Sequence, residues 1–282
     1  MSDATYMIRP KGPARGLAAE AAQFAPWFHN LHLPDGTQTA PDHPLGDFPS
    51  SKWRAIGPVL PADLTGWTAL DIGCNSGFYA IELARRGARV TAIDHDPHFL
   101  RQARWAIEQF GVTDRVELRA AHLYELSRWS EHFDLVLFLG VFYHLRYPLL
   151  GLDLVAERVR RLLVFQTLTM PGEAEEAVPD DFGIDERDRL LAPGWPKLAF
   201  IERQLAGDAT NWWAPNHACV EAMLRSSGLH VRARPAHEIY LCEPAGHPER
   251  PDRSVAAREL LAATGRRRVG RAGPSAEPPE SV

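Results

Sequence analysis

Short apolar runs alternate with amphipathic segments through the middle of the chain. The apolar runs have the length and β-branched content of buried strands, and the segments between them repeat apolar residues at helical spacing. This pattern predicts strands at 68–72, 89–93, 115–119, 133–139 and 161–168, and helices at 77–86, 97–110 and 149–159. It is typical of an α/β protein in which helices cover both faces of a mostly parallel sheet. Ligands of such sheets bind at the carboxyl ends of the strands.

The flanking segments differ from this rhythm. Residues 17–28 contain enough alanine and apolar side chains for a helix, whereas residues 29–51 are rich in proline and glycine and predict a loop. Residues 170–215 are too long for a plain connection, and they are first acidic and then aromatic and proline-rich. We therefore expect them to form a lid or substrate wall. A helix at 216–227 and strands at 229–234 and 237–242 should complete the sheet.

The chain should form one main domain with additions. Its 282 residues, 45% of them hydrophobic, suffice for one sizeable core. The expected parts are an N-terminal helical and loop extension over the active site (1–60), the core (61–169), the inserted lid (170–215) and the final helix and strand pair (216–243). The tail (244–282) should be mostly disordered, with one helix at 255–263.

Charge and cysteine content exclude several classes of function. A net charge of -5 gives no general attraction to nucleic acid or membranes. Three widely spaced cysteines without a C-x-x-C pair indicate neither a disulfide framework nor a zinc site, and no apolar run suggests a membrane span or signal peptide. We expect a cytoplasmic protein. His29, His32 and His43 do not have metal-ligand spacing, so we expect solvated loop histidines and no metal.

The stretch from Leu70 to Tyr79 reads as strand, glycine loop and helix. Its pattern is D-x-G-x-x-x-G, with Asp71, Gly73 and Gly77 at the fixed positions. A dinucleotide site would need a middle glycine, where Asn75 and Ser76 stand instead. This spacing favours a ligand with a cationic amino-acid end near Asp71.

Asp94 ends the next predicted strand. An acid at this point can accept hydrogen bonds from both ribose hydroxyls of a nucleoside. The alternative is that Asp94 only caps the following helix, a role that Asp96 could equally take.

With these residues the chain resembles the class I S-adenosylmethionine (SAM) methyltransferases. Asp71, Gly73 and Gly77 match the first motif of that family and Asp94 the second. The resemblance implies a Rossmann-like seven-stranded sheet, with SAM as the methyl donor and S-adenosylhomocysteine as the product.

A closer resemblance covers residues from about 24 to 243. It rests on segments 26–30, 45–49, 71–79, 140–149 and 210–216, which are similar to a bacterial methyltransferase family related to the enzyme that carboxymethylates 5-hydroxyuridine at the tRNA wobble position. The family implies transfer to a hydroxyl or another small nucleophile. The tRNA enzyme has a lysine just after Pro-Trp that helps to hold a carboxylated donor, whereas this chain has no lysine between Lys11 and Lys52. Ordinary SAM is therefore the expected donor.

Tyr143 and His144 follow the predicted strand 133–139 and are the candidate catalytic residues. A neutral imidazole or a phenolate at a strand end can take a proton from an attacking hydroxyl. The alternative, that His144 holds a loop or orients a neighbour, is equally open.

The remaining site predictions concern the two ligands. Cofactor contacts are expected from Asp71, Gly73, Cys74, Asn75, Gly77, Phe78, Asp94, His95, His122, Leu123 and Gly140, with His122 and Leu123 implied by the resemblance alone. Acceptor contacts are expected from Trp27, His29, Trp53, Tyr79, Arg146, Asn211, Trp212, Trp213 and Asn216. One of the paired tryptophans should stack on the acceptor and the other pack into the core. Asn216 has the alternative of an N-cap, and Trp53 that of covering the sheet.

These observations predict a SAM-dependent methyltransferase acting on a small-molecule acceptor. The rival within the enzyme class is modification of tRNA, for which the chain is too acidic to expect steeply salt-dependent binding. A SAM-binding protein without catalysis is a further alternative, and a nicotinamide dehydrogenase is weaker because the third glycine is missing. The sequence leaves the oligomeric state open, a homodimer included.

Overall fold

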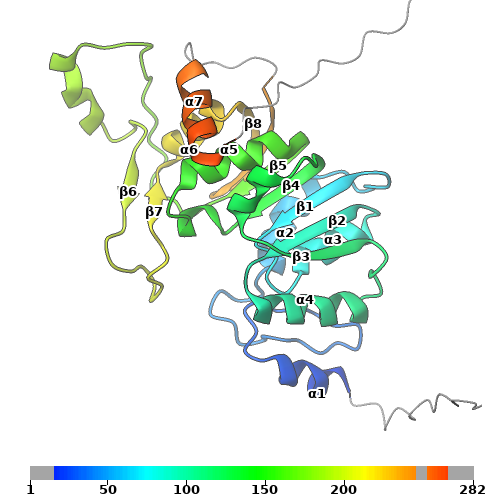
Figure 1. Cartoon of the computed structure of the whole chain (residues 1–282). Coiled ribbons are helices and arrows are strands. Elements are labelled where there is room, and N and C mark those ends of the chain that lie inside the picture. Colours follow the sequence, from blue (N-terminus) through cyan, green and yellow to red (C-terminus); the bar gives the residue numbers. More distant parts are fainter. Residues whose placement is uncertain (1–15, 246–252, 266–282) are drawn as a thin grey trace, which may run out of the picture. The chain divides into compact units, whose positions relative to one another are not determined.

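The computed structural model describes residues 16–245 and 253–265, and these divide into two compact units, Met1–His122 and Leu123–Val282 (Figure 1). Parallel strands form the centre of the first unit. β1 (Thr68–Ile72) pairs with β2 (Arg89–Asp94), which pairs in turn with β3 (Val116–Ala120). Ile72 faces Ile93 in the register, so the residues that follow β1 lie beside the end of β2. The helices α3 (Phe78–Arg85) and α4 (Pro97–Gln109) follow these two strands.

The N-terminal part of the first unit departs from the prediction in two places. Instead of one helix over 17–28, the chain forms α1 (Leu17–Ala21) and a 3-10 turn, η1 (Ala22–Phe24). The helix stops before Pro26, whose ring cannot continue a helical hydrogen-bond ladder. The expected loop also ends earlier, because α2 (Ser50–Ile56) begins directly after Pro49 and is followed by η2 (Gly57–Val59).

The second unit contains the other four strands of the sheet. β4 (Phe133–Leu139) and β5 (Val159–Gln166) are parallel, and β9 (Ile239–Pro244) pairs antiparallel with both β5 and β8 (Leu229–Ala236). The strand order of the seven-stranded sheet is β3-β2-β1-β4-β5-β9-β8. The α/β fold class with a mostly parallel seven-stranded sheet is therefore confirmed.

The helices of the second unit and its inserted segment complete the described chain. They are η3 (Leu123–Arg128), η4 (Phe142–His144), α5 (Pro148–Arg158), η5 (Ile184–Leu191), α6 (His217–Ser226) and α7 (Arg253–Thr264). The insert also forms a two-stranded sheet of β6 (Leu198–Phe200) and β7 (Trp213–Pro215), drawn in yellow-green in Figure 1. α7 confirms the predicted helix at 255–263. The loose order expected for both chain ends falls mostly outside the described residues.

Two expectations from composition can be compared with the structure. Cys74, Cys219 and Cys242 are all buried free thiols, as expected from their number and spacing. Among the described residues, no helix is both long and apolar enough to cross a membrane.

Candidate functional site

The glycine loop of the first unit is a tight turn closed by backbone hydrogen bonds. The amides of Gly73 and Cys74 both donate to the carbonyl of Ile93, each at 2.9 Å. Gly77 has φ +84°, and a Cβ atom there would lie 3.3 Å from the Cβ of Ala103 on α4. A side chain at position 77 would thus meet both backbone strain and crowding, which explains the glycine at the start of α3.

Asp94 ties this loop to the end of β2. Its Oδ2 accepts a hydrogen bond from the Asn75 amide at 2.9 Å, and its Oδ1 accepts one from the Asp96 amide at 2.9 Å. The helix cap is Asp96, whose Oδ1 accepts from the His98 amide at 2.7 Å. The alternative that Asp94 caps α4 is therefore wrong. Each Asp94 oxygen keeps a lone pair that can accept a ribose hydroxyl.

Asp71 is a buried carboxylate without a full set of partners. Its side chain is 2% exposed, and its Oδ2 has no hydrogen-bond partner in the structure. The pKa of Asp71 is raised to about 7, chiefly by burial. A backbone hydrogen bond from Ala80 lowers this pKa, and the negative charge of Asp94 raises it. The hydroxyl of Ser76 is also buried without a partner. Both groups fit a ligand that brings a cationic donor to the loop, such as the amino-acid end of SAM.

The other predicted cofactor residues divide by exposure. His95 and His122 are exposed, with ring centroids 5.6 Å apart at the ends of β2 and β3. Cys74 is fully buried, so only its backbone can reach a ligand, and Phe78 is 9% exposed.

Leu123 and Gly140, two further predicted cofactor residues, lie in the second unit. The Leu123 side chain is 4% exposed and packs 3.2 Å from the Cβ position of Gly151, so an adenine contact through its backbone stays a prediction. Gly140 has φ +70° and donates its amide to the Gln166 carbonyl at 3.3 Å, which places it at the carboxyl end of β4 as predicted.

Tyr143 and His144 lie side by side in η4, which directly follows this strand end. Their ring centroids are 4.2 Å apart. Burial raises the pKa of Tyr143 to about 12, and nearby Glu238 and Asp208 add to this effect. Its phenol is therefore protonated near neutral pH, and the phenolate base considered from the sequence is not supported.

His144 is oriented by two residues of the insert that the sequence analysis missed. Its Nδ1 is 2.9 Å from the Thr210 hydroxyl and 3.3 Å from the Thr210 carbonyl. The Thr210 hydroxyl donates its one hydrogen to Asp208 Oδ1 at 2.6 Å. Toward His144 Nδ1 it can therefore act only as a hydrogen-bond acceptor, so Nδ1 must be the donor. This chain of hydrogen bonds places the imidazole proton on Nδ1 and leaves the Nε2 lone pair available.

The electrostatic surroundings keep this imidazole neutral. Desolvation lowers the pKa of His144 below its ordinary value of 6.5, although Asp208 and the Thr210 carbonyl act in the opposite direction. The carboxylate of Asp208 lies 3.9 Å from Nδ1. The neutral imidazole can accept a proton, and the nearby Asp208 carboxylate can stabilise the imidazolium that forms. The D-x-T sequence at 208–210 was the local signal for this arrangement, since it forms a turn in which the aspartate binds the Thr210 amide at 2.7 Å.

An aromatic cluster in the same unit contains three of the predicted acceptor residues. The guanidinium of Arg146 lies 5.0 Å from the Trp212 ring centroid and 5.7 Å from that of Phe200. Trp212 stacks on Phe200, with an interplanar angle of 17°. Trp213 donates its indole N–H to the Leu145 carbonyl at 2.9 Å, which ties β7 to the segment after η4. Trp213 is thus held in the scaffold, and stacking of Trp212 on an acceptor stays a prediction.

The two asparagines of the insert serve the fold to different degrees. Asn216 is the N-cap of α6, and its Oδ1 accepts from the amides of Cys219 and Lys197 while its Nδ2 donates to the Trp195 carbonyl. The N-cap alternative is confirmed, and the predicted acceptor contact is corrected. Asn211 donates to the Leu205 carbonyl at 2.9 Å and has a buried Oδ1 without a partner.

Three predicted acceptor residues of the first unit, Trp27, Tyr79 and Trp53, make packing contacts within it. Trp27 donates its indole N–H to the Ala21 carbonyl at 2.9 Å, and Tyr79 is 5% exposed. The Trp53 ring lies 6.2 Å from that of Tyr79 and beneath the guanidinium of Arg86 at 4.8 Å, so it packs on α3. Trp27 and Trp53 are half-buried, and their contacts with an acceptor stay predictions.

His29 also contradicts the prediction of a solvated loop histidine. Its side chain is 5% exposed and is surrounded by aromatic rings, among them Phe48 and Phe78. Burial lowers its pKa to about 3, with Lys52 and His43 contributing. His29 is therefore neutral at physiological pH.

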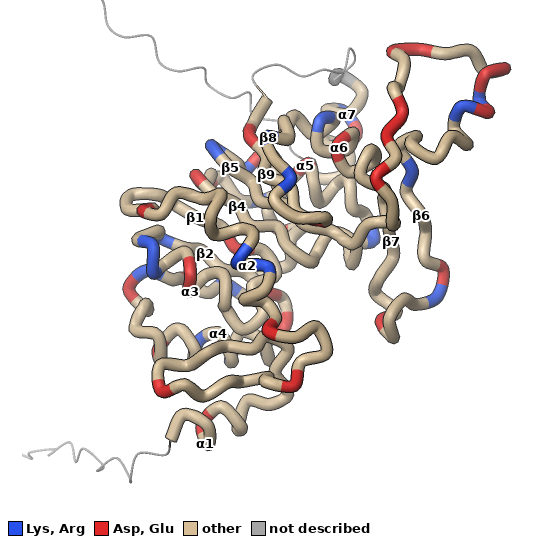
Figure 2. The backbone as a smooth tube through the Cα atoms, turned by 180° about the vertical axis from the view of Figure 1, so that it is seen from behind, with Lys and Arg blue, Asp and Glu red and all other residues tan. Residues whose placement is uncertain are grey.

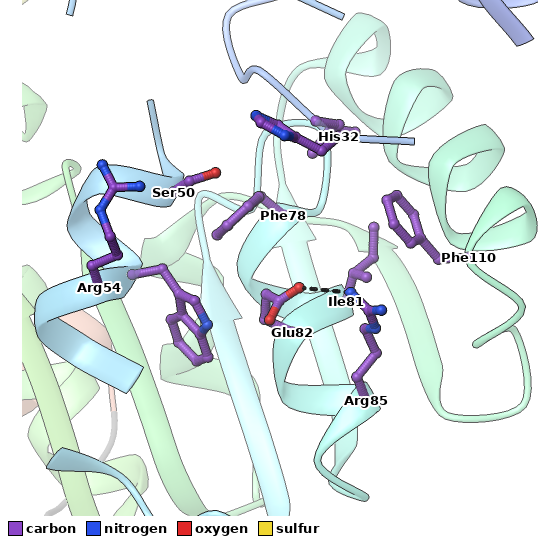
Figure 3. Close-up of a pocket in the computed structure, with 10 residues that line it drawn as sticks. His32, Ser50, Arg54, Phe78, Ile81, Glu82, Arg85 and Phe110 are labelled. Carbon is purple, nitrogen blue, oxygen red and sulfur yellow. Dashed lines mark hydrogen bonds and ion pairs between the residues drawn. The ribbon is translucent and has the colours of Figure 1, made fainter. Parts of the chain in front are cut away.

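A cavity of about 220 Å³ lies between this extension and α3 (Figure 3). His32, Ser50 and Arg54 line it from the extension, and Ile81, Glu82 and Arg85 line it from α3. Arg85 and Glu82 form an ion pair at 3.2 Å across one helical turn. Two predicted site residues, Trp53 and Phe78, also line the cavity, whereas none of the loop residues 71–77 does.

Comparison with known proteins identifies what the central part of the chain is similar to. Residues 69–164 match the model of a methyltransferase domain family. The tRNA U34 carboxymethyltransferase of Marinobacter nauticus is 34% identical over 151 residues, which are 52% of this chain and 45% of that protein. The protein of the same name from Pseudomonas savastanoi pv. phaseolicola is 32% identical over 203 residues, 70% of this chain and 60% of that protein. The chain spans about half the length of the curated relatives it matches.

Solved structures agree on the fold. The N-terminal domain of EvdMO1 with S-adenosylhomocysteine bound has a TM-score of 0.57 at 22% identity, covering 82% of this chain and 96% of that chain. The same domain in the presence of S-adenosylhomocysteine and D-fucose has a TM-score of 0.55 at 21% identity, with the same coverage. At this level of identity the likeness concerns the fold alone.

Proposed function

We propose that this chain, a SAM-dependent methyltransferase similar in sequence to the tRNA U34 carboxymethyltransferases, methylates a hydroxyl, or another small nucleophile, of a small-molecule acceptor. The observation that carries the proposal is the chain of hydrogen bonds from Asp208 through Thr210 to His144. It leaves Nε2 of a neutral imidazole as a proton acceptor, which a hydroxyl nucleophile requires.

In the proposed reaction, the protein aligns the two reactants and manages one proton. Bound SAM supplies an electrophilic methyl group on a sulfonium, and S-adenosylhomocysteine leaves with the C–S bonding electrons. His144 Nε2 takes the proton of the attacking hydroxyl, and Asp208 stabilises the imidazolium that forms. Asp71 and Asp94 hold the donor through its amino group and its ribose. Alignment contributes at most about 7 to 11 kcal/mol, and proton transfer adds a factor of about 10² to 10⁴.

The charge distribution supports a small acceptor. Figure 2 shows basic and acidic residues interspersed along the described chain. The chain carries 31 Lys and Arg against 36 Asp and Glu, so a polyanion gains no general attraction. The insert adds an aromatic cluster around Trp212, whose flat rings suit a sugar or aromatic acceptor.

A second candidate function is carboxymethyl transfer to tRNA. The names of the relatives favour it, because both proteins compared above are tRNA U34 carboxymethyltransferases. The carboxylate of such a donor needs a counter-ion, but Pro26-Trp27 is followed here by Phe28 and then by His29, which burial holds neutral. Ordinary SAM therefore suits this chain better.

A labelling experiment separates the two candidates. The purified protein would be incubated with methyl-tritiated SAM and either a deproteinised small-molecule extract or total tRNA, and radioactivity would be counted in each fraction after removal of SAM. A parallel calorimetric titration would compare SAM, S-adenosylhomocysteine and carboxy-SAM. We expect label in the small-molecule fraction and tighter binding of SAM than of carboxy-SAM.

Two results would overturn the proposal. Preference for carboxy-SAM, together with labelling of tRNA, would establish the second candidate. The second result is that the protein binds SAM but labels neither fraction, so that the radioactivity counted is the same for the wild type and His144→Ala. That result would indicate a SAM-binding protein without catalysis.

A further inference from the structure

Three side chains of the second unit converge on one point. Glu173 lies in the segment that follows β5, His217 is the first residue of α6, and His237 lies between β8 and β9. His217 Nε2 is 3.3 Å from His237 Nδ1, and Glu173 Oε1 is 3.2 Å from His237 Nδ1 and 3.6 Å from His217 Nε2. Two imidazole nitrogens and one carboxylate oxygen thus form a nearly equilateral triangle.

The dimensions of this triangle match one face of a metal coordination sphere. Zinc binds imidazole nitrogen and carboxylate oxygen at about 2.0 to 2.2 Å, which in tetrahedral geometry separates neighbouring ligand atoms by about 3.3 Å. The three distances lie close to this value. An ion could therefore bind with little movement of the side chains, and two histidines with one carboxylate are a known ligand set for divalent transition metals.

Neighbouring residues orient the three candidate ligands. The Tyr240 hydroxyl makes a short hydrogen bond with His217 Nδ1, so the Nε2 lone pair of that ring can face the cluster. Arg234 binds Glu173 Oε2 at 2.5 Å, leaving Oε1 for the cluster. Such outer contacts are the usual means of orienting metal-binding histidines and carboxylates.

We propose that Glu173, His217 and His237 form a binding site for one divalent transition-metal ion, with Zn²⁺ as the fitting representative. The side chains of Glu173 and His237 are 58% and 52% exposed, so solvent can reach the site and supply a fourth ligand. The ion would join the segment after β5, helix α6 and the β8–β9 turn. The sequence offered no signal for it, because Glu173 and His237 are 64 residues apart.

The test is metal binding by the full chain. The purified, metal-stripped protein would compete with a chromophoric chelator for Zn²⁺, and Co²⁺ would be added separately because its visible absorption reports coordination geometry. The variants are His237→Ala and Glu173→Gln, both at exposed positions. The matched control is His230→Ala, an exposed histidine on β8 outside the cluster.

We expect the wild type and His230→Ala to bind one equivalent of Zn²⁺ and to show the absorption of low-symmetry Co²⁺. His237→Ala and Glu173→Gln should lose at least about 10-fold in affinity, because each removes a ligand. Zn²⁺ should also raise the melting temperature of the wild type but not that of His237→Ala. The proposal is overturned if the wild type binds no Zn²⁺, or if His237→Ala binds it as tightly as the wild type; the three side chains then form only a hydrogen-bonded cluster.

Discussion

The glycine loop of the first unit and the surroundings of His144 in the second are built in different ways. The loop is held by the backbone amides of Gly73, Cys74 and Asn75, which donate to the Ile93 carbonyl and the Asp94 carboxylate at the adjacent strand end. His144 is held by side chains of the insert, 66 residues further along the chain. Strand register therefore determines the first arrangement, whereas the second depends on how the insert packs. Substitutions can test whether the two arrangements are functionally separate.

The largest effect is expected from His144→Ala. Loss of the proton acceptor should slow methyl transfer by about 10² to 10⁴, while SAM affinity stays close to that of the wild type, because the donor residues belong to the loop. The measurements are the rate of labelled methyl incorporation into the acceptor fraction and calorimetric titration with SAM. His230→Ala serves as the control for removal of an exposed imidazole. Unchanged turnover would exclude His144 as the base.

Asp94→Ala should produce the opposite pattern. It removes the acceptor for the Asn75 amide as well as the predicted ribose contact, and hydrogen bonds to charged groups contribute about 1.5 to 3 kcal/mol each. We expect SAM affinity to fall about 100-fold in a calorimetric titration. Asp96→Ala is the matched control, since it removes a helix cap worth about 1 kcal/mol of stability and should leave SAM affinity unchanged. Equal losses in both variants would mean that Asp94 acts only through stability.

The loop could be predicted because local rules determine it. Alternation of apolar runs identified the strands, and the positions of Gly73 and Gly77 identified the turn between β1 and α3. Asp94 was predicted at a strand end, and register places it beside Gly73. Asp71 was assigned to the cationic end of a ligand, and its buried, unpartnered oxygen is consistent with that assignment.

Tertiary packing decided the rest. Tyr79 and His29 were predicted to contact the acceptor, but the extension packs on α3 and buries both side chains among aromatic rings, while Trp27 is half-buried beside Trp105 on α4. Asp208 and Thr210 were missed because their partner is distant in sequence. A turn motif such as D-x-T predicts its own backbone hydrogen bonds but not the side chain that will pack against it.

Thr210→Val tests orientation within the second arrangement. Valine keeps the shape of threonine but cannot accept from His144 Nδ1 or donate to Asp208. Turnover should fall by about 10-fold, less than in His144→Ala, because the imidazole stays but loses its preferred tautomer and direction. The measurement is the same labelled-methyl rate, with Thr210→Ser as the variant expected to restore it. A Thr210→Ser rate as low as that of Thr210→Val would mean that the hydroxyl is not the important group.

The smallest effect, a displaced pH profile, is expected from Asp208→Asn. The asparagine oxygen can still accept from the Thr210 hydroxyl, so the orientation of His144 is kept while a negative charge 3.9 Å from Nδ1 is lost. In the wild type, turnover should fall as the pH drops through the pKa of His144, which desolvation places below 6.5, because an imidazolium cannot accept a proton. Asp208 raises that pKa, so its removal lowers the pKa further and moves the acid limb of the turnover profile to lower pH. A limb that moves to higher pH, or does not move, would show that Asp208 acts on His144 through Thr210 alone and not through its charge.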